Sequence, residues 1–169
     1  MRELERQLIL LAQYNVEFVI IGGVAATLHG SSYLTQDLDI CYARDLPNFE
    51  RLASALQSVN ARLRGVPEDV PFLLDAETLR RGLNFTFQTD IGAMDLLGEV
   101  VGVGGFAEAT ASAVEYELFG YRYRVLALDK LIAAKRAAGR PKDLLALPEL
   151  EAILEHQRTH ESPDGPDVE

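Results

Sequence analysis

The 169-residue chain has 48% hydrophobic and 25% charged residues, which is typical of a globular protein with a buried core. Its formal net charge of −10 argues against broad electrostatic binding of nucleic acid, and no apolar run approaches the roughly 20 residues of a membrane span. Cys41 is the only cysteine, which excludes an internal disulfide and a cysteine cluster for zinc. We therefore expect one cytoplasmic domain over residues 1–158, followed by a disordered acidic tail at 159–169.

Apolar periodicity predicts an α/β fold, in which a short mixed sheet is flanked by helices and further helices close the C-terminal side. In chain order, the expected elements are an amphipathic helix at 2–14, a strand at 16–21, a short helix at 24–29, a strand at 37–42, a helix from 46, a helical turn at 76–81, strands at 83–89 and 91–97, a hairpin at 114–126 and helices at 129–139 and 141–158. Prolines interrupt residues 60–75, where only a short strand and a loop are expected, and the glycine-rich stretch 98–105 predicts a loop.

Two glycines, Gly22 and Gly23, directly follow the first predicted strand. Glycine permits a tight turn and close backbone approach, and the first amides of the helix at 24–29 would point toward that turn. These features predict that the protein binds an anion between this turn and a basic cluster in the C-terminal part of the chain. The cluster consists of Lys130, Lys135, Arg136, Arg140 and Lys142.

Acidic residues mark the second predicted strand. Asp37 and Asp39 are two residues apart, so both side chains face one side of the strand, and Thr35 joins them if the strand begins early enough. Adjacent carboxylates repel each other, so such a pair indicates either a bound divalent cation or one shared proton. Asp95 is on a later strand that could pair beside them, and three carboxylates can hold one or two Mg²⁺ ions, which often share the phosphates of a nucleotide.

These motifs together resemble a known superfamily. Gly22-Gly23, followed by Asp37-Leu38-Asp39 and a third acid, resembles the DNA polymerase β-type nucleotidyltransferases. More narrowly, GGVAATLHGSSYLTQDLDI (22–40) resembles the AbiEii- and MenT-type toxin nucleotidyltransferases and their small relatives. DKLIAAKRAAGRPKDLLAL (129–147) is similar to their C-terminal basic-acidic motif. The resemblance extends over residues 16–150 and implies the nucleotidyltransferase fold.

The resemblance also implies roles for individual residues. Asp37 and Asp39 would bind Mg²⁺, and Asp95 would complete the metal site and help to deprotonate the attacking hydroxyl. Lys135 would act as a counter-charge to the triphosphate. The implied substrate-binding residues are Gly22, Gly23, Thr35, Lys135, Lys142 and Asp143.

The implied reaction is the in-line attack of an acceptor hydroxyl on the α-phosphorus of an NTP, with release of pyrophosphate. The acceptor would be an RNA 3′ end, in particular tRNA, or a protein hydroxyl. The protein would act in a toxin–antitoxin or phage-defence system and have a cognate antitoxin. The chain departs from its relatives at Tyr33, where they commonly carry Arg, and at Ala146, where many carry a second Asp. The alternative is a non-catalytic regulator that binds a nucleotide or a partner protein. The three acids favour the enzyme, because clustered acids are costly without a cation.

Overall fold

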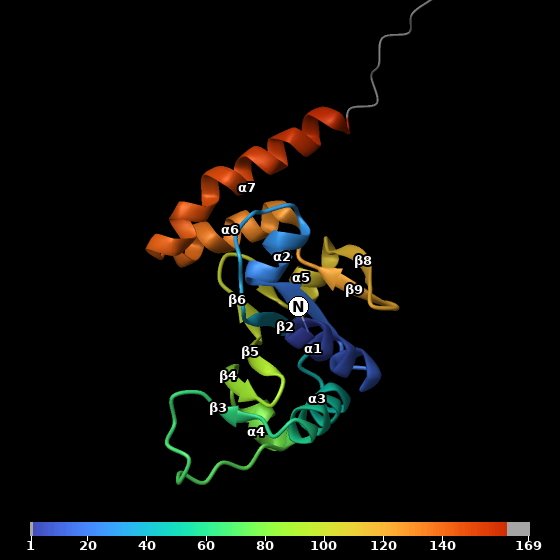
Figure 1. The fold of residues 1–169 in the computed structure, drawn as a ribbon, viewed down its shortest axis with the longest axis vertical. Helices are drawn as coiled ribbons and strands as arrows, with labels where there is room; N and C mark the ends of the chain where they lie inside the picture. Colours follow the sequence, from blue (N-terminus) through green and yellow to red (C-terminus); the bar gives the residue numbers. More distant parts are fainter. Residues whose placement is uncertain (1, 162–169) are drawn as a thin grey trace, which may run out of the picture.

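Figure 1 shows the fold of the computed structural model, which describes residues 2–161. A seven-stranded mixed sheet has the order β3-β4-β5-β2-β1-β9-β8. Its strands are β1 (Phe18–Ile21), β2 (Leu38–Tyr42), β3 (Arg62–Leu63), β4 (Asn84–Thr89), β5 (Gly92–Leu97), β8 (Val114–Leu118) and β9 (Tyr121–Val125). A separate two-stranded sheet pairs β6 (Glu99–Val100) with β7 (Gly104–Gly105). The predicted mixed α/β architecture is confirmed.

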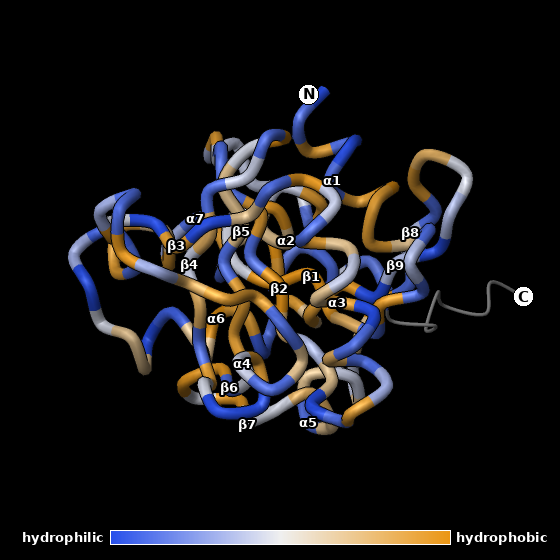
Figure 2. Tube along the Cα trace, turned by 90° about the horizontal axis from the view of Figure 1, so that it is seen from below, coloured by the Kyte–Doolittle hydropathy of each residue, from blue (hydrophilic) through white to orange (hydrophobic). Residues whose placement is uncertain are grey.

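Helices cover both sides of the central strands. They are α1 (Arg2–Gln13), α2 (Gly22–Leu28), α3 (Leu46–Ser58), α4 (Ala76–Arg81), α5 (Phe106–Ala111), α6 (Leu128–Ala138) and α7 (Pro141–His160). Figure 2 shows β1 and β2 between α1 and α5, with hydrophobic residues concentrated along these central strands. All four residues of β1 are buried, as expected of a strand covered on both faces. In the part of the chain that the structure describes, none of these helices combines the length and apolar character needed to cross a membrane.

The register of the central strands brings the predicted acids together. β2 is antiparallel to β1 and parallel to β5, so it lies between them. Asp39 is opposite Ile21 on one side and opposite Asp95 on the other. The expectation that the strand of Asp95 pairs beside the Asp37-Leu38-Asp39 strand is therefore confirmed.

A buried capping network fixes the start of α3. Asp45 caps the helix by accepting a hydrogen bond from the backbone N–H of Asn48 at 3.0 Å, and Pro47 lies in the first turn. The amide side chain of Asn48 is fully buried, and it donates to the carbonyls of Glu17 and Ala43 and accepts from the N–H of Glu17. Because every polar atom of this side chain is satisfied, it ties the end of β2 to the chain before β1.

Several predicted boundaries are wrong. Gly22 and Gly23 form the first residues of α2 rather than a separate turn, because the positive φ of Gly22 (65°) lets the chain leave β1 directly into the helix. β2 begins at Leu38, so Thr35 is not on the strand. The glycine-rich stretch contains β6 and β7, and α5 was not predicted because its sequence FAEATA has only one large apolar residue. α7 spans Pro141–His160, close to the predicted helix at 141–158, and residues 162–169 of the predicted tail lie outside the described part.

Candidate active site

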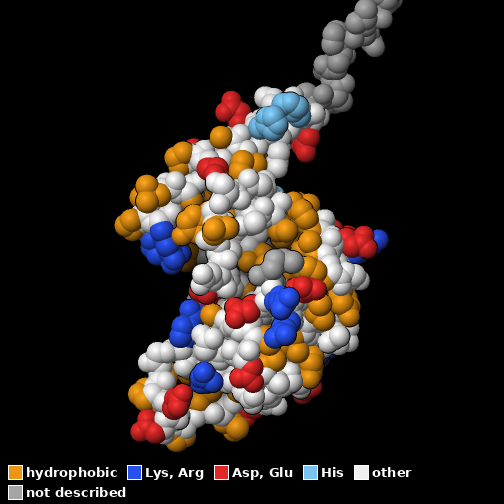
Figure 3. Space-filling view, in the orientation of Figure 1, with side chains coloured by type: hydrophobic (Ala, Val, Ile, Leu, Met, Phe, Trp, Pro, Cys, Tyr) orange, Lys and Arg blue, Asp and Glu red, His pale blue; other side chains and the backbone are white. Residues whose placement is uncertain are grey.

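A pocket of about 620 Å³ lies between the sheet and the two C-terminal helices. Figure 3 shows the molecule hollowed between the part that carries α6 and α7 and the part that carries β3 and β4, with Lys and Arg side chains on both sides of the hollow. All of the site residues predicted from the sequence line this pocket. They are Gly22, Gly23, Thr35, Asp37, Asp39, Asp95, Lys135, Lys142 and Asp143.

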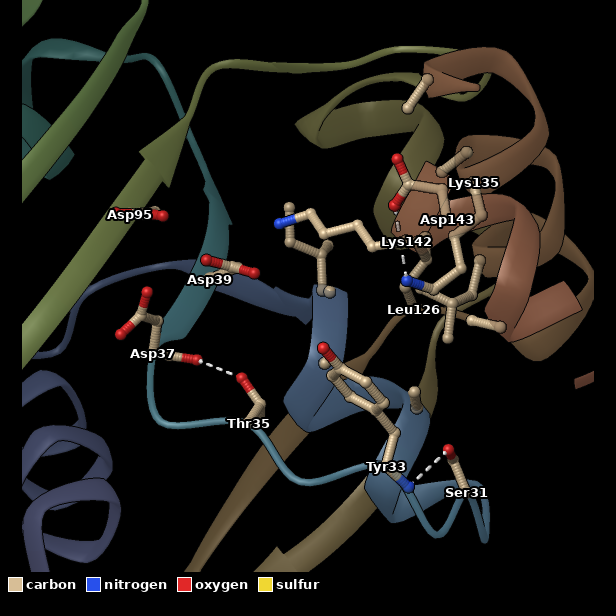
Figure 4. A pocket seen from close by; sticks show the side chains of 18 of the residues that line it. Ser31, Tyr33, Thr35, Asp37, Asp39, Asp95, Leu126, Lys135, Lys142 and Asp143 are labelled. Atoms are coloured by element: carbon tan, nitrogen blue, oxygen red, sulfur yellow. Dashed lines mark hydrogen bonds and ion pairs between the residues drawn. The ribbon is translucent and has the colours of Figure 1, made fainter. Parts of the chain in front are cut away.

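The acidic wall of the pocket is formed by Asp37, Asp39 and Asp95, which we call the three-acid cluster. Asp39 and Asp95 are directly opposite each other on parallel strands, and Asp37 immediately precedes β2. Figure 4 shows these side chains together on one side of the pocket. The sheet register therefore places three oxygen ligands of the type that Mg²⁺ prefers at one end of neighbouring strands.

The two glycines allow the start of α2 to lie against this cluster. A Cβ atom on Gly22 would be 2.1 Å from Oδ2 of Asp39, and Gly22 also has a φ of +65°. A Cβ atom on Gly23 would be 2.7 Å from Cβ of Thr35. Any larger residue at Gly22 would displace the Asp39 carboxylate, so close approach explains this glycine better than a turn alone does.

The environment of Asp39 disfavours its negative charge. Burial raises the pKa of Asp39 from 3.8 to about 7, with further contributions from the charge of Asp95, a hydrogen bond to Asp95 and the charge of Asp37. Lys142 acts in the opposite direction, and Figure 4 shows its side chain extending toward Asp39. At neutral pH this carboxyl therefore either shares a proton or requires a cation, the two alternatives left open by the sequence.

An arginine that the sequence analysis did not single out lies against the same acids. Nη1 of Arg64 is 3.5 Å from Oδ2 of Asp37, and Nη2 donates to Oδ1 of Asp95. Arg64 is in the stretch 60–75, where prolines interrupt the periodicity and no local pattern marks a functional residue. Only the fold brings it to the cluster.

The donor chemistry of the three-acid cluster fits a hard divalent cation, because all three side chains offer carboxylate oxygens and Asp39 lacks sufficient positive charge around it. Within residues 2–161, however, no three His, Cys, Asp or Glu side chains converge closely enough to enclose an ion as they stand. Arg64 instead pairs with two of the acids. A cation therefore fits the ligands by chemistry and requires a rearrangement of their side chains.

The basic wall of the pocket is organised by the buried carboxylate of Asp143, which is 2% exposed. Nε of Arg140 donates to this carboxylate at 2.6 Å, and Nζ of Lys135 is 3.8 Å from it. Burial acts to raise the pKa of Asp143, but the hydrogen bond and charge of Arg140 and the charge of Lys135 outweigh it and lower the pKa. Asp143 thus remains ionised and holds two cations at the pocket.

The predicted basic cluster is only partly assembled. Lys135, Arg140 and Lys142 line the pocket, whereas Lys130 and Arg136 do not. Arg136 pairs with Glu151 of α7 instead. The difference arises because successive residues of a helix point in different directions, so a basic run in the sequence does not form one patch.

The loop between α2 and β2 completes the pocket with Tyr33, which stands where the resemblance led us to expect Arg. The N–H of Tyr33 donates to Oγ of Ser31 at 3.1 Å, and its carbonyl accepts from Oγ1 of Thr27 at 3.1 Å. Ser31 and Ser32 both donate to the carboxylate of Glu149 in α7. The backbone of Tyr33 is therefore anchored, while the residue as a whole is 58% exposed and its ring points into the pocket (Figure 4).

Comparison with solved structures identifies the fold. The lincomycin-bound lincosamide antibiotic adenylyltransferase LnuA superposes with a TM-score of 0.58 at 13% identity, covering 90% of this chain and 97% of that chain. ANT(2″)-Ia in complex with adenylyl-2″-tobramycin superposes with a TM-score of 0.53 at 14% identity, and the match covers 92% of this chain and 94% of that chain. The chain has a nucleotidyltransferase fold. No model of a protein family matches the sequence, and no curated protein matches it.

The nucleotidyltransferase fold agrees with the superfamily predicted from the Gly-Gly and Asp-x-Asp motifs. The narrower resemblance to AbiEii- and MenT-type toxins remains a prediction, because the solved structures are antibiotic-modifying enzymes at low sequence identity. Since the match covers nearly the whole of both chains, the pocket lies within the shared fold rather than in an added segment.

Proposed function

We propose that the protein is a Mg²⁺-dependent nucleotidyltransferase that transfers NMP from an NTP to an acceptor hydroxyl. The observation that carries this proposal is the position of the three-acid cluster, which faces Lys135, Arg140 and Lys142 across one pocket. A nucleoside triphosphate needs oxygen-coordinated cations at one end of its phosphates and fixed positive charge at the other. The two walls of the pocket offer both.

In this proposal the three-acid cluster holds Mg²⁺. The metal would supply charge stabilisation at the α-phosphate and activation of the attacking hydroxyl. Asp95 helps to accept the proton of that hydroxyl, while Asp39, whose negative charge is disfavoured by burial, gains a counter-charge. The hydroxyl oxygen forms a bond to the α-phosphorus, the α–β bridging P–O bond breaks, and pyrophosphate leaves.

The chain's own cations would bind the phosphates. Lys142 extends toward the acids, and Lys135 is oriented by Asp143 (Figure 4). Gly22 and Gly23 let the start of α2 lie directly against Asp39 and Thr35, so these residues line the pocket beside the acids, where the triphosphate would bind. Most of the rate enhancement would come from positioning and charge stabilisation.

Two acceptor classes are proposed. The sequence resemblance favours an RNA 3′ end, in particular tRNA, in a toxin–antitoxin or phage-defence system with a cognate antitoxin. The near full-length superposition on LnuA and ANT(2″)-Ia favours a small hydroxylated molecule, because the structures of those enzymes contain lincomycin and adenylyl-2″-tobramycin. The chemistry at the α-phosphorus is the same in both cases.

Label transfer tests this proposal. The protein would be incubated with Mg²⁺ and each α-labelled NTP, together with total RNA, cellular protein, or a panel of aminoglycosides and lincosamides. The double variant Asp37→Ala/Asp39→Ala is the inactive control, and Glu117→Gln, an exposed residue of β8 at the far edge of the sheet, is the surface-charge control.

Label on an acceptor with wild type and with Glu117→Gln, but not with the double variant, would establish the activity, the base and the acceptor class. NTP binding without transfer to any acceptor would instead support the non-catalytic regulator. If the protein neither binds NTP nor transfers label, the proposed activity is wrong and only the nucleotidyltransferase fold stands.

A further inference from the structure

We propose that Arg64 is a built-in counter-cation of the three-acid cluster that a divalent cation must displace. The inference rests on the metal-dependent function proposed above and adds to it a competitor for the metal within the chain. It predicts that Arg64 weakens metal binding while it stabilises the protein without metal.

The fold fixes Arg64 beside the acids through its backbone. Arg64 directly follows β3, and its N–H donates to the carbonyl of Thr86 in β4 at 2.9 Å. Thr86 is paired in register with Asp95 of β5. Two steps of backbone pairing therefore place the guanidinium next to Asp95, so the contact is not a chance meeting of long surface side chains.

The guanidinium bridges two acids of the cluster. It pairs with Asp37 through Nη1 and with Asp95 through Nη2, which uses the planar fork of arginine. One positive charge thus serves two negative charges. The two ion pairs of Arg64 do not include the third acid, Asp39.

Both ion pairs are accessible to solvent and can therefore be exchanged. The side chains of Arg64, Asp37 and Asp95 are 37%, 45% and 23% exposed. Partly exposed pairs are weak because water and salt screen them. A divalent cation carries twice the charge of Arg64 and can also contact Asp39, so it can displace Arg64 from these carboxylates. The energy needed to separate the existing ion pairs reduces the affinity for the cation.

Mn²⁺ binding provides a test that does not depend on catalysis. Calorimetry with Mn²⁺ alone would compare wild type with Arg64→Gln and with Arg122→Gln, an exposed residue of β9 on the other side of the central strands. We expect Arg64→Gln to bind Mn²⁺ about fivefold more tightly, the scale of a partly exposed ion pair. We also expect its melting temperature in EDTA to fall, because Asp37 and Asp95 lose their counter-charge. Arg122→Gln removes the same charge and should change neither quantity.

Arg64→Lys gives a second variant in case Arg64→Gln folds poorly. It keeps the charge but replaces the fork with a single ammonium, so its Mn²⁺ affinity should lie between those of wild type and Arg64→Gln. Unchanged Mn²⁺ affinity in both variants would overturn the proposal and leave Arg64 as a structural residue. Weaker binding would also overturn it, because Arg64 would then orient the ligands.

Asp39→Asn separates failure of this inference from failure of the proposed function. If Asp39→Asn abolishes Mn²⁺ binding while the Arg64 variants behave as wild type, the metal site exists and only the displacement is wrong. If Asp39→Asn binds Mn²⁺ as wild type does, the cluster is not the metal site, and both proposals fail.

Discussion

Replacing Asp39 with Asn removes a carboxyl group whose pKa is raised from 3.8 to about 7 in the folded protein. Between these pH values the folded chain keeps a proton that the unfolded chain has lost, so stability falls as the pH rises. Below about pH 4 both states are protonated and the penalty is absent. Above about pH 7 the penalty is complete, because the folded protein must then carry this partly buried charge.

The expected size of this effect follows from the pKa. A change from 3.8 to about 7, at roughly 1.36 kcal/mol for each pH unit, gives an upper value of about 4 kcal/mol. Asp39 is partly exposed, and solvent screening reduces this to about 2 kcal/mol. For a chain of this length, this corresponds to a difference in melting temperature of about 4–8 °C.

Thermal unfolding in EDTA between pH 4 and pH 8 would measure the effect. Asp39→Asn cannot ionise, so it should match wild type near pH 4 and melt about 4–8 °C higher at pH 8. Adding Mg²⁺ at pH 8 should raise the melting temperature of wild type but not of Asp39→Asn, because metal binding requires the ionised carboxylate. Glu117→Gln should follow wild type throughout. If the melting temperatures of wild type and Asp39→Asn change in parallel with pH, the assignment of the raised pKa to Asp39 is wrong.

Two further substitutions test the walls of the pocket. Gly22→Ala should lower stability by about 2 kcal/mol and abolish transfer, because the new Cβ combines a φ of +65° with a contact of 2.1 Å to Asp39. Gly120 has a similar φ (+84°), but an added Cβ there would lie in open space, so Gly120→Ala should cost about 1 kcal/mol of stability and retain full transfer activity. Equal losses of activity in the two variants would show that the contact between the new Cβ and Asp39 is not the cause. Asp143→Asn should cost about 2 kcal/mol in chemical denaturation, because it leaves Arg140 and the partly buried Lys135 without their shared carboxylate. It should raise KM for NTP more than it lowers kcat. An unchanged KM would show that Asp143 has no part in nucleotide binding.

Local patterns in the sequence were sufficient for most of the elements. β1 is an apolar run, β8 and β9 flank Phe119-Gly120, and α3 follows a capping aspartate, Asp45. These signals work because burial periodicity and capping act over a few residues. β6 and β7 were missed because each has only two residues within a glycine-rich stretch, and α5 because its sequence FAEATA has a single large apolar residue and therefore no apolar stripe.

The acidic half of the pocket could also be predicted from the sequence. Asp37 and Asp39 are two residues apart, and alternation along the chain indicates a shared face without any knowledge of the fold. Asp95 required the further expectation that its strand would pair with β2, which the register confirms. The chemistry of paired carboxylates then follows from their mutual repulsion.

Only the tertiary structure decided how the charges in the pocket are matched. Arg64 reaches the acids through the pairing of β3 with β4 and of β4 with β5, which together bring Arg64 to Asp95, 31 positions away in the chain. The packing of α6 against α7 likewise determines that Asp143 holds Lys135, while Lys142 extends toward Asp39. The sequence determined which charged groups the chain carries and which acids share a face. The partners of those groups depend on long-range pairing and helix packing, which no local pattern encodes.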